Sequence, residues 1–88
     1  MMPNEKQIRA LARNALEAGT LPWHDPDRTW GGPGVGLPCA VCGDRIPAGQ
    51  MEYEVQFGHD GETPSPDRFH LHLPCFAAWE EERTEPRN

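Results

Sequence analysis

The stretch WGGPGVGLPCAVCG, residues 30–43, sets five glycines and two prolines around two cysteines that lie two residues apart. The glycines either cradle a ligand themselves or let the backbone fold tightly around whatever the cysteines hold. A phosphate-binding loop is disfavoured, because no Gly-Lys-Ser/Thr follows and Leu37 stands where G-x-G-x-x-G spacing needs its third glycine. We therefore expect the four glycines of residues 31–36 to carry the chain past the cysteine turn, with Trp30 packed nearby.

The cysteine pair has a counterpart further along the chain. Cys39-Ala-Val-Cys42 has the spacing of a zinc knuckle, in which a tight turn directs two thiolates at one ion, and Gly43 supplies the backbone freedom for that turn. His72-Leu-Pro-Cys75 repeats the spacing. Four sulfur and nitrogen ligands complete a tetrahedron, which is typical of a structural zinc ion rather than a catalytic one. The sequence thus predicts one structural Zn²⁺ held by Cys39, Cys42, His72 and Cys75.

Other roles for these residues stay open. A Cys-x-x-Cys pair can be a redox dithiol, but such pairs usually start a helix after a strand in an α/β fold that is too large for this chain. The three cysteines can also be unrelated buried side chains. His70 lies on the same predicted strand face as His72 and competes with it as a ligand. The spacing to Cys75 favours His72, which leaves His70 as a neighbour of the site.

Size and composition favour a metal-stabilised domain. The chain has 88 residues, 36% of them hydrophobic, with 9 glycines and 10 prolines, so its core is small. A domain of this kind usually needs a metal, disulfides or a partner to fold stably. Its 3 cysteines are an odd number, which fits metal ligation better than a disulfide framework.

Hydrophobic spacing predicts a helix, two strands and a second helix. Asn4 can cap a helix that runs to about Ala18 and is amphipathic. Its apolar face comprises Ile8, Leu11, Ala12, Ala15 and Leu16. Alternation in MEYEVQF, residues 51–57, predicts a half-buried strand whose glutamates face water, and RFHLH, residues 68–72, predicts a second strand. Pro74 suits the first turn of a closing helix.

These elements divide the chain into three parts. The first part, residues 1–36, contains the first helix and most of a connector rich in Trp, Gly and Pro. This connector, residues 20–38, shows no helical or alternating pattern. Residues 37–84 form the zinc-binding module, and residues 85–88 are expected to be a disordered tail. The two tryptophans of the connector either anchor it to a small core or contact a partner.

The net charge of −6 is unevenly placed. Residues 1–36 are neutral overall, so the cysteine-containing remainder carries the whole negative charge and is a poor phosphate binder. Lys6, Arg9 and Arg13 form a short basic stripe on the first helix, which we interpret as a solvated face rather than a nucleic-acid patch. The same interpretation as solvated faces applies to Glu52, Glu54, Glu80, Glu81 and Glu82.

Targeting and membrane segments are not expected. The chain has no run of about 18 apolar residues, which a membrane-spanning helix requires. Its N-terminal residues carry charges throughout, unlike a secretory signal. We therefore expect a cytoplasmic location.

Two cysteines, a hairpin and a His-x-x-Cys that leads into a helix are the layout of a treble-clef zinc finger. The spacing C-x2-C-x29-H-x2-C, with Ile46 shortly after the second cysteine and Phe76 directly after the last, resembles the zinc finger of poly(ADP-ribose) polymerases over roughly residues 37–83. The wider pattern also resembles small bacterial zinc-finger proteins. The resemblance implies a small α+β, treble-clef-like fold with an added N-terminal helix. It implies the metal site but not the DNA-break recognition of that family, because this module displays glutamates.

Three functions compete. The first is a non-catalytic zinc-binding module for a protein partner, to which the amphipathic helix contributes unless it packs on its own domain. The second is nucleic-acid binding through the basic stripe and Arg28, with Trp23 or Trp30 stacked on bases. The third is an enzyme, which requires an open coordination position on the zinc ion, and no nucleophile has a matched base by spacing.

Overall fold

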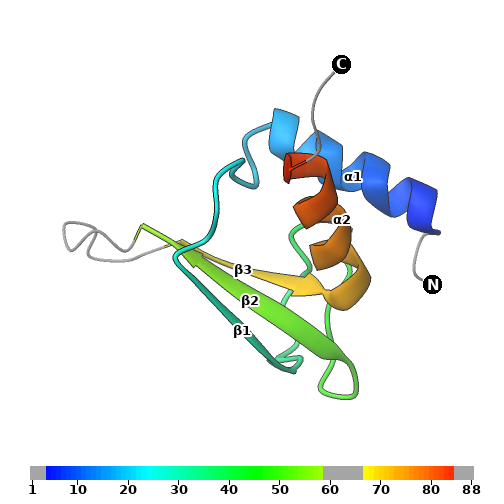
Figure 1. The fold of residues 1–88 in the computed structure, drawn as a ribbon. Helices are drawn as coiled ribbons and strands as arrows, with labels where there is room; N and C mark the ends of the chain where they lie inside the picture. Colours follow the sequence, from blue (N-terminus) through cyan, green and yellow to red (C-terminus); the bar gives the residue numbers. More distant parts are fainter. Residues whose placement is uncertain (1–3, 59–66, 85–88) are drawn as a thin grey trace.

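A computed structural model of the chain describes residues 4–58 and 67–84, which form two helices and a three-stranded sheet (Figure 1). The elements follow in the order α1 (Glu5–Glu17), β1 (Arg28–Pro33), β2 (Met51–Phe57), β3 (Asp67–His72) and α2 (Leu73–Thr84). The expected small α+β architecture is confirmed. The tail predicted at residues 85–88 lies outside the described residues. Within the described part, neither helix has the length and apolar character that crossing a membrane requires.

The sheet is antiparallel throughout, with the strand order β1-β2-β3. Helix α2 lies against one face of the sheet, and α1 packs on α2 on the side away from the strands (Figure 1). Ring contacts join the sheet to α2, with 4.3 Å between the ring centroids of Tyr53 and Phe76 and 6.1 Å between those of Phe57 and Trp79. The strands predicted at residues 51–57 and 68–72 are confirmed as β2 and β3, which pair with each other.

Strand β1 corrects the expectation that residues 20–38 are irregular. Arg28–Pro33 pairs with β2 along its whole length, from Arg28 opposite Gln56 to Pro33 opposite Met51. Its sequence, RTWGGP, has no apolar alternation and its side chains are mostly exposed, so no period-2 signal exists. Proline and glycine are tolerated here because β1 is an edge strand. Backbone hydrogen bonding to β2, rather than side-chain burial, therefore defines this strand.

Helix α1 begins as the sequence predicts and is closely packed. The side chain of Asn4 accepts a hydrogen bond from the backbone N–H of Gln7, and the Gln7 side chain accepts one from the Asn4 N–H, which completes a capping box. The apolar face buries Ile8 and Leu16, each of which contributes about 1.5–3 kcal/mol. Between them Ala12 is fully buried, and small side chains of this kind let two helices approach closely.

Trp79 is the centre of the core. Its side chain is fully buried on α2, and its indole N–H donates a 3.1 Å hydrogen bond to the carbonyl of Pro22. This bond and the fully buried Leu21 attach the connector to the core. Trp23 and Trp30, the candidate anchors, are 38% and 43% exposed, so the connector is anchored mainly by other residues. Trp30 is only partly packed, as part of β1.

Two glycines of the Gly-rich stretch have the role expected of them. A side chain at Gly34 would overlap the carbonyl oxygens of Ile46 and Pro47, so the chain passes directly against the segment that follows the cysteine turn. Gly36 has a φ of +82°, a conformation that favours glycine. Gly36 N–H donates to the carbonyl of Ile46 at 2.8 Å, which closes this contact. The glycines therefore hold the chain close to the cysteines.

Burial corrects the interpretation of two glutamates as solvated. Glu52 is only 4% exposed and Glu82 only 7% exposed. Glu82 lies on α2 beneath α1, where its two carboxylate oxygens accept 2.8 Å hydrogen bonds from the Nε atoms of Arg9 and Arg13. Burial alone would raise the pKa of Glu82, but the hydrogen bonds from Arg13 and Arg9 hold it below its ordinary value. Two members of the basic stripe are thus structural partners of α2.

Replacing Glu82 tests this contact. We expect Glu82→Gln to destabilise the chain by about 1–3 kcal/mol, because two charged hydrogen bonds are lost at a buried carboxylate. The folded-state pKa is lowered, so the ionised carboxylate stabilises the fold above the ordinary carboxyl pKa of 4.5. This contribution is lost as the pH falls through the folded-state pKa.

Urea unfolding of the two chains at pH 7, pH 5.5 and pH 4 measures the difference. It should be similar at the first two values and smaller at the third. Glu81→Gln, one residue away on a half-exposed side chain, is the matched control and should have little effect. Equal stabilities of Glu82→Gln and the unmodified chain at pH 7 would contradict the assignment.

Candidate metal centre

The first half of the site is a tight turn that contains Cys39 and Cys42. The turn is closed by an antiparallel bridge between Pro38 and Arg45, and the N–H of Cys39 donates a 2.8 Å hydrogen bond to the carbonyl of Asp44. Gly43 has a φ of +83°, which explains the glycine after the second cysteine. Within the turn, the N–H of Val41 donates to the Cys39 sulfur at 3.4 Å. The local sequence thus directs both sulfur atoms to the same side.

The second half of the site lies where β3 ends and α2 begins. His72 is the last residue of β3, and Cys75 lies in the first turn of α2. One backbone hydrogen bond joins the halves, since the N–H of Ala40 donates to the carbonyl of His70 at 2.9 Å. This backbone bond attaches the cysteine turn to β3.

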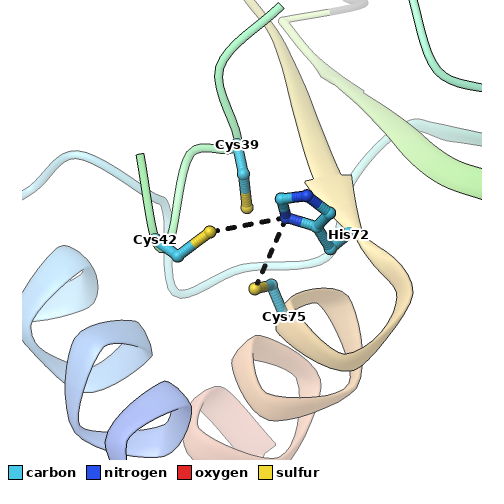
Figure 2. A group of neighbouring side chains, drawn as sticks. All are labelled: Cys39, Cys42, His72 and Cys75. Atoms are coloured by element: carbon cyan, nitrogen blue, oxygen red, sulfur yellow. Dashed lines mark hydrogen bonds between the residues drawn. The ribbon is translucent and has the colours of Figure 1, made fainter. Parts of the chain in front are cut away.

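The structure brings the four predicted ligands together, as Figure 2 shows. One ligand atom from each of Cys39, Cys42, His72 and Cys75 lies within 4.8 Å of the others. The Nδ1 atom of His72 is 3.4 Å from the Cys42 sulfur and 4.0 Å from the Cys75 sulfur. Zinc–sulfur and zinc–nitrogen bond lengths in a tetrahedron place neighbouring S and N ligands about 3.6 Å apart. These separations bracket that value, so the cluster has the donor set and the size to hold a metal ion.

Burial and thiol chemistry also suit a cation. Cys39, His72 and Cys75 are buried, Cys42 is partly exposed, and all three cysteines are free thiols. A hydrogen bond from Cys75 lowers the pKa of the Cys39 thiol to about 4, whereas the same bond raises the pKa of Cys75. Burial raises the pKa of Cys42. The cluster by itself therefore favours one thiolate, and a bound cation stabilises the thiolates that the other two cysteines form on releasing their protons.

His70 does not exchange with His72 in this structure. Its Nδ1 atom lies 2.7 Å from Oε2 of Glu52, on the neighbouring strand, and its Nε2 atom lies 3.9 Å from Oε1 of Glu54. Sequence reasoning considered His70 only in relation to the cysteines and took both glutamates as solvated. The signal that joins them is the alternation of Glu52 and Glu54 on one predicted strand, opposite alternating histidines on the next.

Comparison with known proteins adds no assignment. No protein-family model, no curated protein and no solved structure matches the chain. The candidate site consequently stands on its own geometry and donor chemistry.

The choice between the two histidines can be tested by cobalt binding. We expect Co²⁺ to give thiolate charge-transfer bands and strong tetrahedral visible bands with the unmodified chain. His72→Ala should weaken Co²⁺ binding at this site by at least about tenfold, because a direct ligand is lost, whereas His70→Ala should keep the thiolate spectrum. Titration followed by absorption measures both. A thiolate spectrum that survives in His72→Ala but disappears in His70→Ala would reverse the assignment.

Proposed function

We propose that this protein is a non-catalytic zinc-binding module whose single structural Zn²⁺ holds a surface for a protein partner. The observation that carries the proposal is the Cys3His cluster of Cys39, Cys42, His72 and Cys75. It is mostly buried, and the distances between its ligand atoms are close to those in a tetrahedral zinc site. Four protein ligands leave no position for an activated water molecule, which a catalytic zinc ion needs. The three free thiols suit a reducing compartment such as the cytoplasm.

The arrangement of the site supports a treble-clef-like description. A cysteine turn comes first, the antiparallel pair of β2 and β3 follows, and α2 begins directly after the ligand His72. This order is the one that underlies the resemblance to the zinc finger of poly(ADP-ribose) polymerases. α1 and β1 are additions to that arrangement, one packed on α2 and the other on β2.

The surface beside the cluster supports protein binding. Met51 and Leu73 are 52% and 41% exposed, and with His72 they line a hollow of about 340 Å³. Exposed apolar side chains that surround a hollow are typical of contact sites for another protein. The zinc ligand His72 forms part of the same hollow, so the ion would fix the shape of this surface.

Nucleic-acid binding has less support. Arg9 and Arg13 both bind Glu82, and Arg9 also pairs with Glu81 and Arg13 with Glu17, so two of the three cations in the basic stripe already have carboxylate partners within the fold. The residues after position 36 carry the whole net charge of −6. Phosphate binding needs several uncompensated cations, because its affinity comes largely from counterion release.

Zinc content and folding test the metal part of the proposal. We expect native mass spectrometry of the untagged chain to show one tightly held Zn²⁺, and EDTA to remove it together with the helical circular dichroism signal. A structural zinc ion of this kind contributes on the order of 10 kcal/mol, which is comparable to the whole stability of a small domain. Adding Zn²⁺ back should restore the signal. A chain that stays folded without metal would overturn the structural role.

A variant of the apolar hollow tests the binding part. Met51→Ser combined with Leu73→Ser should reduce the amounts of specific co-purifying proteins at least tenfold, while zinc content stays unchanged. Val35→Ser, which removes an apolar side chain that is 63% exposed elsewhere, is the control and should retain them. Fluorescence titration with labelled single- and double-stranded DNA and RNA at low salt should show no binding. Salt-dependent oligonucleotide binding by the folded chain would instead favour the nucleic-acid alternative.

A further inference from the structure

A second group of metal-ligating side chains lies on the sheet. Alternation along β2 places Glu52 and Glu54 on the face opposite to Tyr53 and Phe57, whose rings contact α2. Register places Glu54 directly across from His70 on β3, and Glu52 two positions along the same face. Two carboxylates and one imidazole thus converge on a face that α2 does not cover.

The three side chains lie close enough for one ligand atom from each to reach a single ion. His70 contacts the two carboxylates through different ring nitrogens, with Nδ1 at the hydrogen-bond distance of 2.7 Å from Glu52 Oε2 and Nε2 3.9 Å from Glu54 Oε1. One ligand atom from each of the three residues lies within 4.8 Å of the others, as in the cysteine cluster. No cysteine belongs to the group, so its chemistry differs from that of the first site.

The buried carboxylate of Glu52 gives independent evidence for a ligand. Its side chain is 6% exposed, and its Oε1 atom is buried without a hydrogen-bond partner. Such an atom costs about 1–3 kcal/mol and more when it carries charge, so native proteins usually satisfy it. Among the residues that the structure describes, this is the one buried side-chain oxygen or nitrogen left without a partner.

Charge points to a cation as the missing partner. Two carboxylates beside a neutral imidazole carry −2, and beside an imidazolium they still carry −1. Arg68 approaches Glu54 to 3.9 Å with a side chain that is 60% exposed, while Glu52 contacts His70 through one oxygen and its other oxygen has no partner. A divalent ion would balance both carboxylates and satisfy Glu52 Oε1 at once.

We propose that Glu52, Glu54 and His70 form a second divalent-cation site, separate from the cysteine cluster. Two oxygens and one imidazole nitrogen suit Mn²⁺, Fe²⁺ or Zn²⁺ rather than a thiophilic ion such as Cu⁺. Three protein ligands leave coordination positions for water or a small anion, unlike the four ligands of the first site. The Glu54 side chain is 26% exposed and that of His70 is 14% exposed, so the ion enters from solvent past Glu54.

Manganese titration tests this site by itself, because Mn²⁺ prefers oxygen and nitrogen donors to thiolates. The chain is first loaded with one equivalent of Zn²⁺, and MnCl₂ is added while the electron paramagnetic resonance signal of free Mn²⁺ is followed. We expect one Mn²⁺ bound per chain. Glu54→Gln and His70→Gln should each weaken its binding at least about tenfold, since changes even to groups that only support metal ligands cost 10–100-fold.

Glu81→Gln removes the same charge from α2 and is the matched control, which should bind Mn²⁺ like the unmodified chain. Circular dichroism checks that each variant remains folded, and Glu54→Gln is the safer one because its side chain is partly exposed. Native mass spectrometry with excess Zn²⁺ should show two ions on the unmodified chain and one on Glu54→Gln. Absence of Mn²⁺ binding at 1 mM, or equal binding by all four chains, would overturn the second site. Either result would leave the cysteine cluster unaffected.

Discussion

Convergence of four ligand atoms from two distant parts of the chain is the constraint on which this fold depends. Cys39 and Cys42 must approach the junction of β3 and α2 closely enough that all four donors lie within 4.8 Å. The backbone bond from Ala40 to His70 holds this approach, and Gly34 allows the preceding chain to pass against Ile46. Three sulfur atoms and an imidazole held this closely could bind a shared cation, which would compensate the thiolates whose formation burial opposes. The rest of the molecule is arranged around that junction.

Buried charge organises the remainder of the molecule. On one side of α2, Glu82 binds two arginines of α1 and converts a helix face that looks cationic in the sequence into an internal contact. On the face of the sheet opposite to α2, Glu52 is buried beside His70 with one oxygen unsatisfied. The first carboxylate has both oxygens hydrogen-bonded to arginines, whereas the second has one oxygen without a partner. This contrast explains why the first is a structural contact and the second is the proposed cation site.

Much of the fold could be predicted because its signals are local. The cap at Asn4, the alternation in residues 51–57 and the helical position of Pro74 each depend on neighbours in the sequence, and the structure has the elements that they predict. Strand β1 could not be predicted in this way, because its side chains are exposed and its pairing with β2 depends on backbone hydrogen bonds to a distant segment. The burial of Glu52 and Glu82 was missed for a related reason. A run of charged residues in a sequence is interpreted as a solvated face, because the sequence does not show that an oppositely charged side chain from another helix or strand will pack against it.

The sequence by itself determined the type and spacing of the donor groups. One Cys-x-x-Cys pair and one His-x-x-Cys pair predict a single cluster of four ligands, because the two ligands of each pair are close enough in sequence to bind the same ion. The spacing to Cys75 favoured His72 over His70 as the fourth donor, and the tertiary structure places His72, the last residue of β3, beside the three cysteines. Only the tertiary structure decided that His70 meets Glu52 and Glu54. The register between β2 and β3 places these three side chains together. Register depends on how the two strands pair in the folded sheet, so it cannot be read from the spacing of residues along the chain.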